Sequence, residues 1–115
     1  MERKMAMSEH LSFYVQFHVK AECIGEFKER AMYVLENMSK EDKFEVCYFH
    51  QHTEDPTKFS VYESWTEPSA EAFMANQLHA KEYRKAYEER LPDLLVSPRI
   101  ITFLDPIKRW RRQWK

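Results

Sequence analysis

The stretch LSFYVQFHVKAECIGEFKERAMYVLENM, residues 11–38, changes its hydrophobic period once, and this change decides the fold class. From Leu11 to Lys20, apolar and polar side chains alternate strictly, which is the period of a strand buried on one face. From Ala21 to Met38, apolar residues recur every three or four positions, and charged residues take the opposite side. The sequence therefore predicts a strand followed directly by an amphipathic helix of about five turns.

Downstream of this unit the sequence predicts a hairpin, two helices and a final strand. Two runs rich in aromatic and β-branched residues flank Asp55-Pro56, a dipeptide that favours a turn because proline presets its own φ. Pro92 is expected to end the second helix, since proline cannot continue the helical hydrogen bonds. The predicted elements are strands at 44–51 and 59–65, helices at about 69–77 and 79–90, and a strand at 99–104. The order βαββααβ indicates a single α+β domain, with a four-stranded sheet that carries its helices on one face.

The second face of such a sheet would be uncovered in a monomer. Large side chains are expected on that face, and the candidates are Tyr14, Phe49, Tyr62 and Phe103. A monomer that exposes a face of this kind is unusual, whereas symmetric pairing of sheet against sheet covers it. We therefore expect a homodimer.

Composition narrows the class of protein. The chain has 115 residues, which suits one domain, and its formal net charge of -1 gives no general attraction for polyanions. The single glycine, Gly25, excludes the glycine-rich phosphate loops of P-loop and Rossmann nucleotide sites. Cys23 and Cys47 lack the spacing of a metal site and are interpreted as reduced thiols. No apolar run is long enough to span a membrane, and residues 1–9 lack the apolar core of a secretory signal, so we expect a cytoplasmic protein.

The sequence divides into an N-terminal extension at 1–10, a domain at 11–104 and a basic tail at 105–115. The tail places five positive charges around Trp110 and Trp114. Such a mixture can bind anionic lipid or nucleic acid, and it can equally cover a partner subunit. We favour the subunit interface, because the acidic remainder of the chain opposes binding to a polyanion. We expect no nucleic-acid partner.

The segment EDPTKFSVYESWTEPSAEAFMANQLHAKEY carries Asp55-Pro56, then Tyr62-Glu63-x-Trp65, then Ala70, with His79 ahead of Tyr83. This ordered set resembles the antibiotic biosynthesis monooxygenase family, and the likeness extends over roughly residues 11–104. The resemblance implies a ferredoxin-like domain with an antiparallel sheet that pairs sheet to sheet as a dimeric α+β barrel. It also implies a quinol-monooxygenase-like enzyme, which oxidises a small quinol- or anthrone-like aromatic with dioxygen and without metal, flavin or other cofactor.

The resemblance implies a site in which His79 handles the proton, Trp65 shapes the pocket, and Glu63 orients or pairs. The side chains expected to contact the substrate are Tyr62, Met74, Phe73, Tyr14 and His50. From the residues alone, His79 is also interpreted as a capping or surface histidine, and Glu63 as a carboxylate paired across the dimer. His18, His50 and His52 share no ligand spacing, so we predict no metal site.

Two alternatives to the monooxygenase stay open. Relatives often carry a second histidine at the position that Met74 occupies here, five residues before His79. Methionine cannot take a proton, so this departure favours a non-catalytic dimeric module that binds a small ligand. Other relatives isomerise small sugars or degrade haem, and a reaction of that kind on the same fold is the second alternative.

Overall fold

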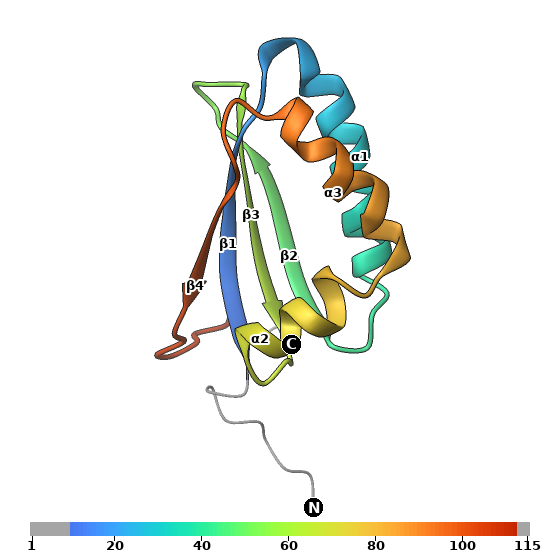
Figure 1. Cartoon of the computed structure of the whole chain (residues 1–115). Coiled ribbons are helices and arrows are strands. Elements are labelled where there is room, and N and C mark those ends of the chain that lie inside the picture. The colour runs from blue at the N-terminus through green and yellow to red at the C-terminus, as the bar shows by residue number, and fades with distance from the viewer. Residues whose placement is uncertain (1–9, 113–115) are drawn as a thin grey trace, which may run out of the picture.

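The computed structural model describes residues 10–112, and it places three helices and several helical turns on one side of a four-stranded sheet (Figure 1). The elements are, in order, β1 (Leu11–His18), η2 (Ala21–Cys23), α1 (Ile24–Met38), β2 (Phe44–Gln51), β3 (Lys58–Trp65), α2 (Ala70–Phe73), η3 (Met74–Leu78), η4 (Glu82–Arg84), α3 (Lys85–Leu94) and β4 (Ile100–Leu104). All neighbouring strands are antiparallel, in the order β2-β3-β1-β4. The predicted βαββααβ order and the ferredoxin-like α+β fold are confirmed.

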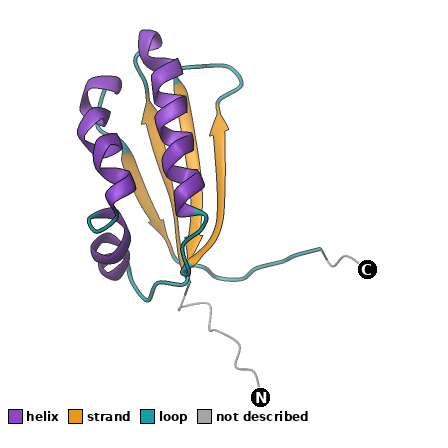
Figure 2. Cartoon of the chain, turned by 90° about the vertical axis from the view of Figure 1, so that its right-hand side faces the viewer, coloured by secondary structure: helices purple, strands orange, loops and turns teal. Residues whose placement is uncertain are grey.

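The core lies between the sheet and the two long helices, which run side by side over one face (Figures 1 and 2). Phe13, Val15 and Phe17 of β1 pair with Glu63, Val61 and Phe59 of β3 in antiparallel register, so both sets point to the helices. The α1 side chains that meet them are buried at helical spacing: Phe27, Ala31, Val34 and Met38. The change of period at residue 21 therefore places two apolar faces against each other.

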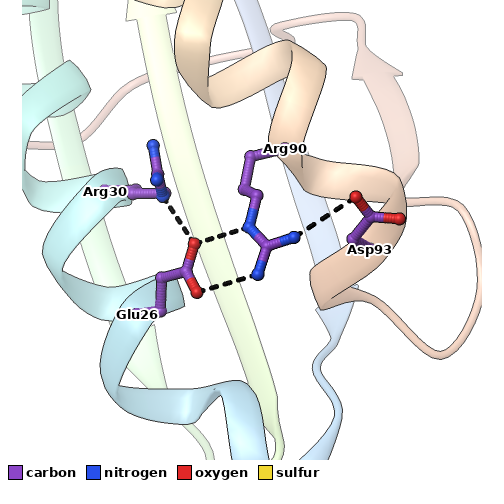
Figure 3. A network of polar contacts seen from close by, with 4 residues as sticks. All are labelled: Glu26, Arg30, Arg90 and Asp93. Atoms are coloured by element: carbon purple, nitrogen blue, oxygen red, sulfur yellow. Dashed lines mark hydrogen bonds and ion pairs between the residues drawn. The ribbon is translucent and has the colours of Figure 1, made fainter.

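Helices α1 and α3 are joined at the surface by a network of ion pairs (Figure 3). Glu26 Oε2 accepts hydrogen bonds from Arg90 Nε and Arg30 Nε, each at 2.7 Å, and Glu26 Oε1 accepts one from Arg90 Nη2 at 3.0 Å. Arg90 Nη1 also donates to Asp93 at 3.2 Å. The Arg90 hydrogen bonds, followed by the one from Arg30, lower the pKa of Glu26 to about 2. Since these side chains are more than a third exposed, water screens the network and it adds little to stability at neutral pH.

Pro92 does not end the last helix as predicted; α3 continues through it to Leu94. Proline removes one backbone donor, but the following turn closes with a hydrogen bond from Leu95 N to Leu91 O at 3.1 Å. Leu91 and Leu94 are both buried against the sheet. Burial of these leucines therefore offsets the loss of one hydrogen bond.

Two of the four residues that were predicted on the open face of the sheet lie on the other face. Tyr14 and Tyr62 pair across β1 and β3 and lie on the face without helices. Phe49 and Phe103 are instead on the helix side, where Phe49 contacts Phe27 and Phe103 contacts Phe13. A β-bulge between residues 44 and 46 explains the error on β2, because an extra residue reverses the faces that the alternation assigns.

The segment after β4 passes the end of the sheet in extended form and then runs outward (Figure 2). Its Arg109, Trp110 and Arg111 line an open hollow of about 430 Å³ together with Tyr48 and Tyr62 of the open face. Its large apolar residues are exposed, Ile107 to 93% and Trp110 to 80%. Trp114 of the predicted basic tail lies outside the described residues, as does nearly all of the predicted N-terminal extension. Within residues 10–112 no helix is long and apolar enough to cross a membrane.

Candidate functional site

The sheet separates the predicted site residues into two groups. Glu63, Trp65, Phe73 and Met74 lie on the helix side, and His79 follows them at the end of η3. Tyr14, Tyr62 and His50 lie on the open face, where the rings of Tyr48 and Tyr62 stack at 6.3 Å and those of Tyr48 and His50 at 6.5 Å. One monomer therefore does not bring all eight residues into a single pocket. The carboxyl group of Glu63 and the indole of Trp65 lie on the helix side.

Glu63 is a carboxyl group enclosed in the core. Its side chain is 5% exposed, and its Oε1 accepts a hydrogen bond from Trp65 Nε1 at 2.9 Å. Burial raises the pKa of Glu63, while the bond from Trp65 and the charges of Arg84 and Arg99 oppose this rise. The expected pairing of Glu63 across a dimer through the open face does not fit, because the carboxyl points to the helices.

Trp65 holds this carboxyl from within the same strand. The two residues are two positions apart, so their side chains leave β3 on one face. The indole is fully buried and meets Phe44 edge-on at 5.5 Å and Phe73 at 5.2 Å. These rings fix the direction of the indole N–H, and with it the orientation of the Glu63 carboxyl.

Glu63 borders a small internal cavity of about 40 Å³ between the sheet and the helices. Its walls are mainly apolar and come from β1, β3, β4, α1 and the helical segments between residues 73 and 87, together with Arg99. A larger, open hollow of about 680 Å³ adjoins it and contains Met74 and His79. The two spaces share Leu78, Arg84 and Arg99 in their walls, so these three residues form the boundary between the outer hollow and the buried carboxyl.

Two arginines at this boundary were missed by the sequence reasoning. Arg99 precedes β4, and its two terminal nitrogens donate to Glu88, Nη2 at 2.7 Å and Nη1 at 2.9 Å. Arg84 ends η4 and is buried, with its Nη1 3.7 Å from Glu88 Oε2. In the sequence Arg84 lies within the predicted helix at 79–90 and Arg99 begins the predicted strand at 99–104, and charged residues at such positions are typically on the surface. Nothing in the local pattern indicates that either faces an internal cavity.

His79 lies at the rim rather than beside Glu63. It caps the π-helical turn η3, where its backbone N–H donates to Met74 O at 3.0 Å, and its side chain is exposed. Met74 is half-buried and lines the same outer hollow. This position fits the interpretation of His79 as a capping or surface histidine, and it also places the residue in the lining of the outer hollow.

A buried polar cluster supports the turn that carries these two residues. Glu67 is almost fully buried, and its carboxylate accepts hydrogen bonds from Gln77 Nε2 at 3.0 Å and Asn76 Nδ2 at 3.3 Å. Because Asn76 and Gln77 belong to η3, these bonds connect the loop after β3 to the π-helical turn. A single π-helical turn inside a helical segment is often found at a functional site.

Cys47 is the other reactive side chain beside Glu63, and it is a poor candidate for catalysis. Cys47 pairs with Glu63 across β2 and β3, and burial raises the pKa of its thiol to about 12. Such a thiol stays protonated and is a poor nucleophile. In the part of the chain that the structure describes, no group of three His, Cys, Asp or Glu side chains is placed to hold a metal ion.

Solved structures share this fold at low sequence identity. A candidate antibiotic biosynthesis monooxygenase from Nitrosomonas europaea is 20% identical, with 84% of this chain and 89% of that chain covered and a TM-score of 0.74. A conserved protein from Methanosarcina mazei is 19% identical, with 85% and 94% covered and a TM-score of 0.72. A third structure, an antibiotic biosynthesis monooxygenase, is 17% identical, with 85% and 99% covered and a TM-score of 0.74.

No protein-family model and no curated protein matches the chain in sequence. The structural likenesses nevertheless confirm the resemblance at the level of architecture: the chain has the ferredoxin-like α+β fold of the antibiotic biosynthesis monooxygenases.

Proposed function

We propose that the protein is a monooxygenase that oxidises a small electron-rich aromatic, quinol- or anthrone-like, with dioxygen and without metal or flavin. The observation that carries the proposal is the Glu63 carboxyl, which is buried in an apolar cavity and oriented by Trp65. A carboxylate whose pKa is raised by burial is a stronger base than one in water. The names of the structural neighbours support the same class of reaction.

In this proposal Glu63 takes the proton from a phenolic hydroxyl of the substrate. The phenolate that results is electron-rich enough to pass one electron to dioxygen, and the radical pair combines at a ring carbon. The peroxide anion takes the proton back from Glu63 to form the hydroperoxide. Loss of water, with the hydrogen of the same ring carbon, then leaves a quinone, so one oxygen atom enters the product and the other leaves as water. The apolar walls of the inner cavity keep bulk water from Glu63 and strengthen its electrostatic interaction with the phenolate oxygen that reaches it.

The substrate ring would lie in the outer hollow against Met74, Leu78 and His79, because the inner cavity of about 40 Å³ is too small for it. Its hydroxyl would pass the boundary and reach Glu63. We assign the proton to Glu63 rather than to His79 because His79 is exposed to solvent at the rim. His79 then contacts the outer part of the ring.

Oxygen uptake by metal-stripped protein, measured against a panel of quinols and hydroxylated polycyclic aromatics, tests this function. Glu63→Gln keeps the acceptor for Trp65 but removes the base, and we expect it to lower the rate by about a hundredfold or more. His79→Ala should retain kcat and raise only KM, because His79 contacts the outer part of the ring and carries no proton in this proposal. The reverse pattern would assign the proton to His79, and a panel with no uptake above the protein-free rate would contradict the oxygenase.

We also infer that two copies pair through the open faces of their sheets. The surface there is rich in tyrosine, with Tyr14, Tyr48 and Tyr62 side by side and Ile100 of β4 exposed to 58%. A sheet face that exposes several aromatic side chains is better covered than left in water. Tyr14, Tyr62 and His50, which the sequence placed at the substrate, would then lie in the dimer interface.

Met74 supports a second candidate function, a non-catalytic module that binds a small ligand. It lines the outer hollow at the position where relatives often have a histidine. An aromatic that binds there, as shown by quenching of protein fluorescence, with no oxygen uptake would favour this module over the enzyme.

A further inference from the structure

Arg84 is a buried cation that has no short ion pair. The phenol of Tyr83 interacts with its guanidinium but carries no negative charge. Its side chain is 5% exposed, and its Nε has no hydrogen-bond partner within residues 10–112. Nη2 lies 3.1 Å from the thioether sulfur of Met38, which is a weak acceptor. The ion pair with Glu88 is long, at 3.7 Å.

The neighbouring carboxylates are already engaged. Glu88 accepts two short hydrogen bonds from Arg99, and Glu41 accepts from Lys81 at 2.9 Å and from Tyr83 at 2.9 Å. Glu63 already accepts the hydrogen bond from Trp65 Nε1 at 2.9 Å.

A guanidinium stays charged in a protein, and a buried charge without a close counter-charge is costly. Arg84 borders both the inner cavity and the outer hollow. An anion at this boundary would supply the missing partner, and a carboxylate suits the planar fork of arginine better than a spherical ion does.

We propose that Arg84 binds a carboxylate of the substrate, so that the site takes a hydroxylated aromatic acid whose ring lies in the outer hollow. The identity of this ligand as a substrate rests on the proposed function. A carboxylate beside the phenolic hydroxyl fits the small volume behind the boundary, whereas a second ring does not. Arg84 is then the residue that selects acidic over neutral aromatics, and Arg99 keeps its bond to Glu88 at the entrance.

The test compares two probes of nearly equal shape. Hydroxynaphthoic acid, with hydroxyl and carboxylate on adjacent carbons, and its neutral amide are each titrated into the full chain at neutral pH by calorimetry. We expect the acid to bind about tenfold more tightly or better, because hydrogen bonds to charged groups are stronger than neutral ones. Equal affinity of the two probes, or no binding of either, overturns the proposal without any variant.

Variants then assign the preference to Arg84. Arg84→Gln should bind acid and amide equally, while Arg84→Lys should keep part of the preference. Arg90→Gln is the matched control, since Arg90 is on the same helical segment but binds Glu26 at the surface. A preference that survives in folded Arg84→Gln, or that disappears in Arg90→Gln, overturns the assignment.

Oxygen uptake separates the two proposals. If the acid is preferred but no aromatic is oxidised, the anion site stands and the oxygenase fails. If neutral naphthol and the acid are oxidised with equal kcat/KM, the oxygenase stands and the substrate class fails.

Discussion

The pair formed by Trp65 and Glu63 can be tested by a double-mutant cycle. Trp65→Phe removes the indole N–H that donates to Glu63 Oε1 at 2.9 Å, but keeps an aromatic ring between Phe44 and Phe73. Glu63→Leu replaces the carboxyl by an apolar group of similar size. The cycle compares the free energy of unfolding of the wild type, the two single variants and the double variant.

The magnitude follows from burial and from the hydrogen bond. Trp65 is fully buried, so loss of the pyrrole part of its ring should cost about 2 kcal/mol in packing. In the presence of Glu63 the same change also leaves a buried carboxyl without its donor, which costs a further ~1–3 kcal/mol. With leucine at position 63 this second cost disappears. We therefore expect Trp65→Phe to cost about 3–5 kcal/mol alone and about 2 kcal/mol in the Glu63→Leu background.

Urea unfolding followed by far-ultraviolet circular dichroism measures all four proteins, at one protein concentration because an oligomer's stability depends on it. A coupling below about 0.5 kcal/mol would mean that the two side chains act independently, and would refute the geometry of the site.

The pH dependence of the Glu63→Leu variant gives a second readout. Because burial raises the folded-state pKa of Glu63, its contribution is fully present below the unfolded pKa and is lost as pH rises through the folded one. Glu63→Leu should therefore gain stability relative to the wild type as pH increases. A gain as pH decreases would contradict the direction of the shift.

Three further predictions concern other parts of the fold. The bonds from Arg90 and Arg30 lower the pKa of Glu26 from 4.5 to about 2, so the contribution of Glu26 to stability is present above pH 4.5 and is lost as pH falls through about 2. The Arg90→Gln variant should therefore lose less stability than the wild type as the pH is lowered over this range. Parallel curves of stability against pH for the two proteins would contradict the network in Figure 3. Ser69 Oγ accepts a hydrogen bond from Ala72 N at 3.0 Å as the N-cap of α2, so Ser69→Ala should cost about 1 kcal/mol in urea unfolding, and no loss would show that the cap is dispensable. Tyr62→Glu places charge on the open sheet face and should convert a dimer to a monomer in sedimentation equilibrium, whereas a wild type that sediments as a monomer would remove the dimer proposal altogether.

Much of the fold could be predicted from local pattern, and the exceptions have physical causes. The alternation in residues 11–20 and the helical spacing after residue 21 predicted β1 and α1, because each period corresponds to one backbone geometry. The end of α3 was predicted too early, since burial of Leu91 and Leu94 outweighs the cost of Pro92.

The candidate site was predictable only in part. Glu63 and Trp65 could be placed on one face of one strand, because residues two positions apart share a face in any strand. Their hydrogen bond and the burial of the carboxyl required the packing of α1 and α3. Arg84 was missed because its burial depends on Met38, which is distant in the chain.

The sequence by itself determined the order of elements, the strand and helix periods, and the exclusion of glycine-rich phosphate sites, because these depend on neighbouring residues or on composition. The tertiary structure decided which face each side chain occupies and which charges meet. A bulge after Phe44 moved Phe49 to the helix side, and the packing of η4 and α3 against the sheet brought Arg84 to the cavity beside Glu63. Local periodicity does not carry such information, because the register of a sheet and the docking of a helix are fixed by contacts between residues far apart in the chain.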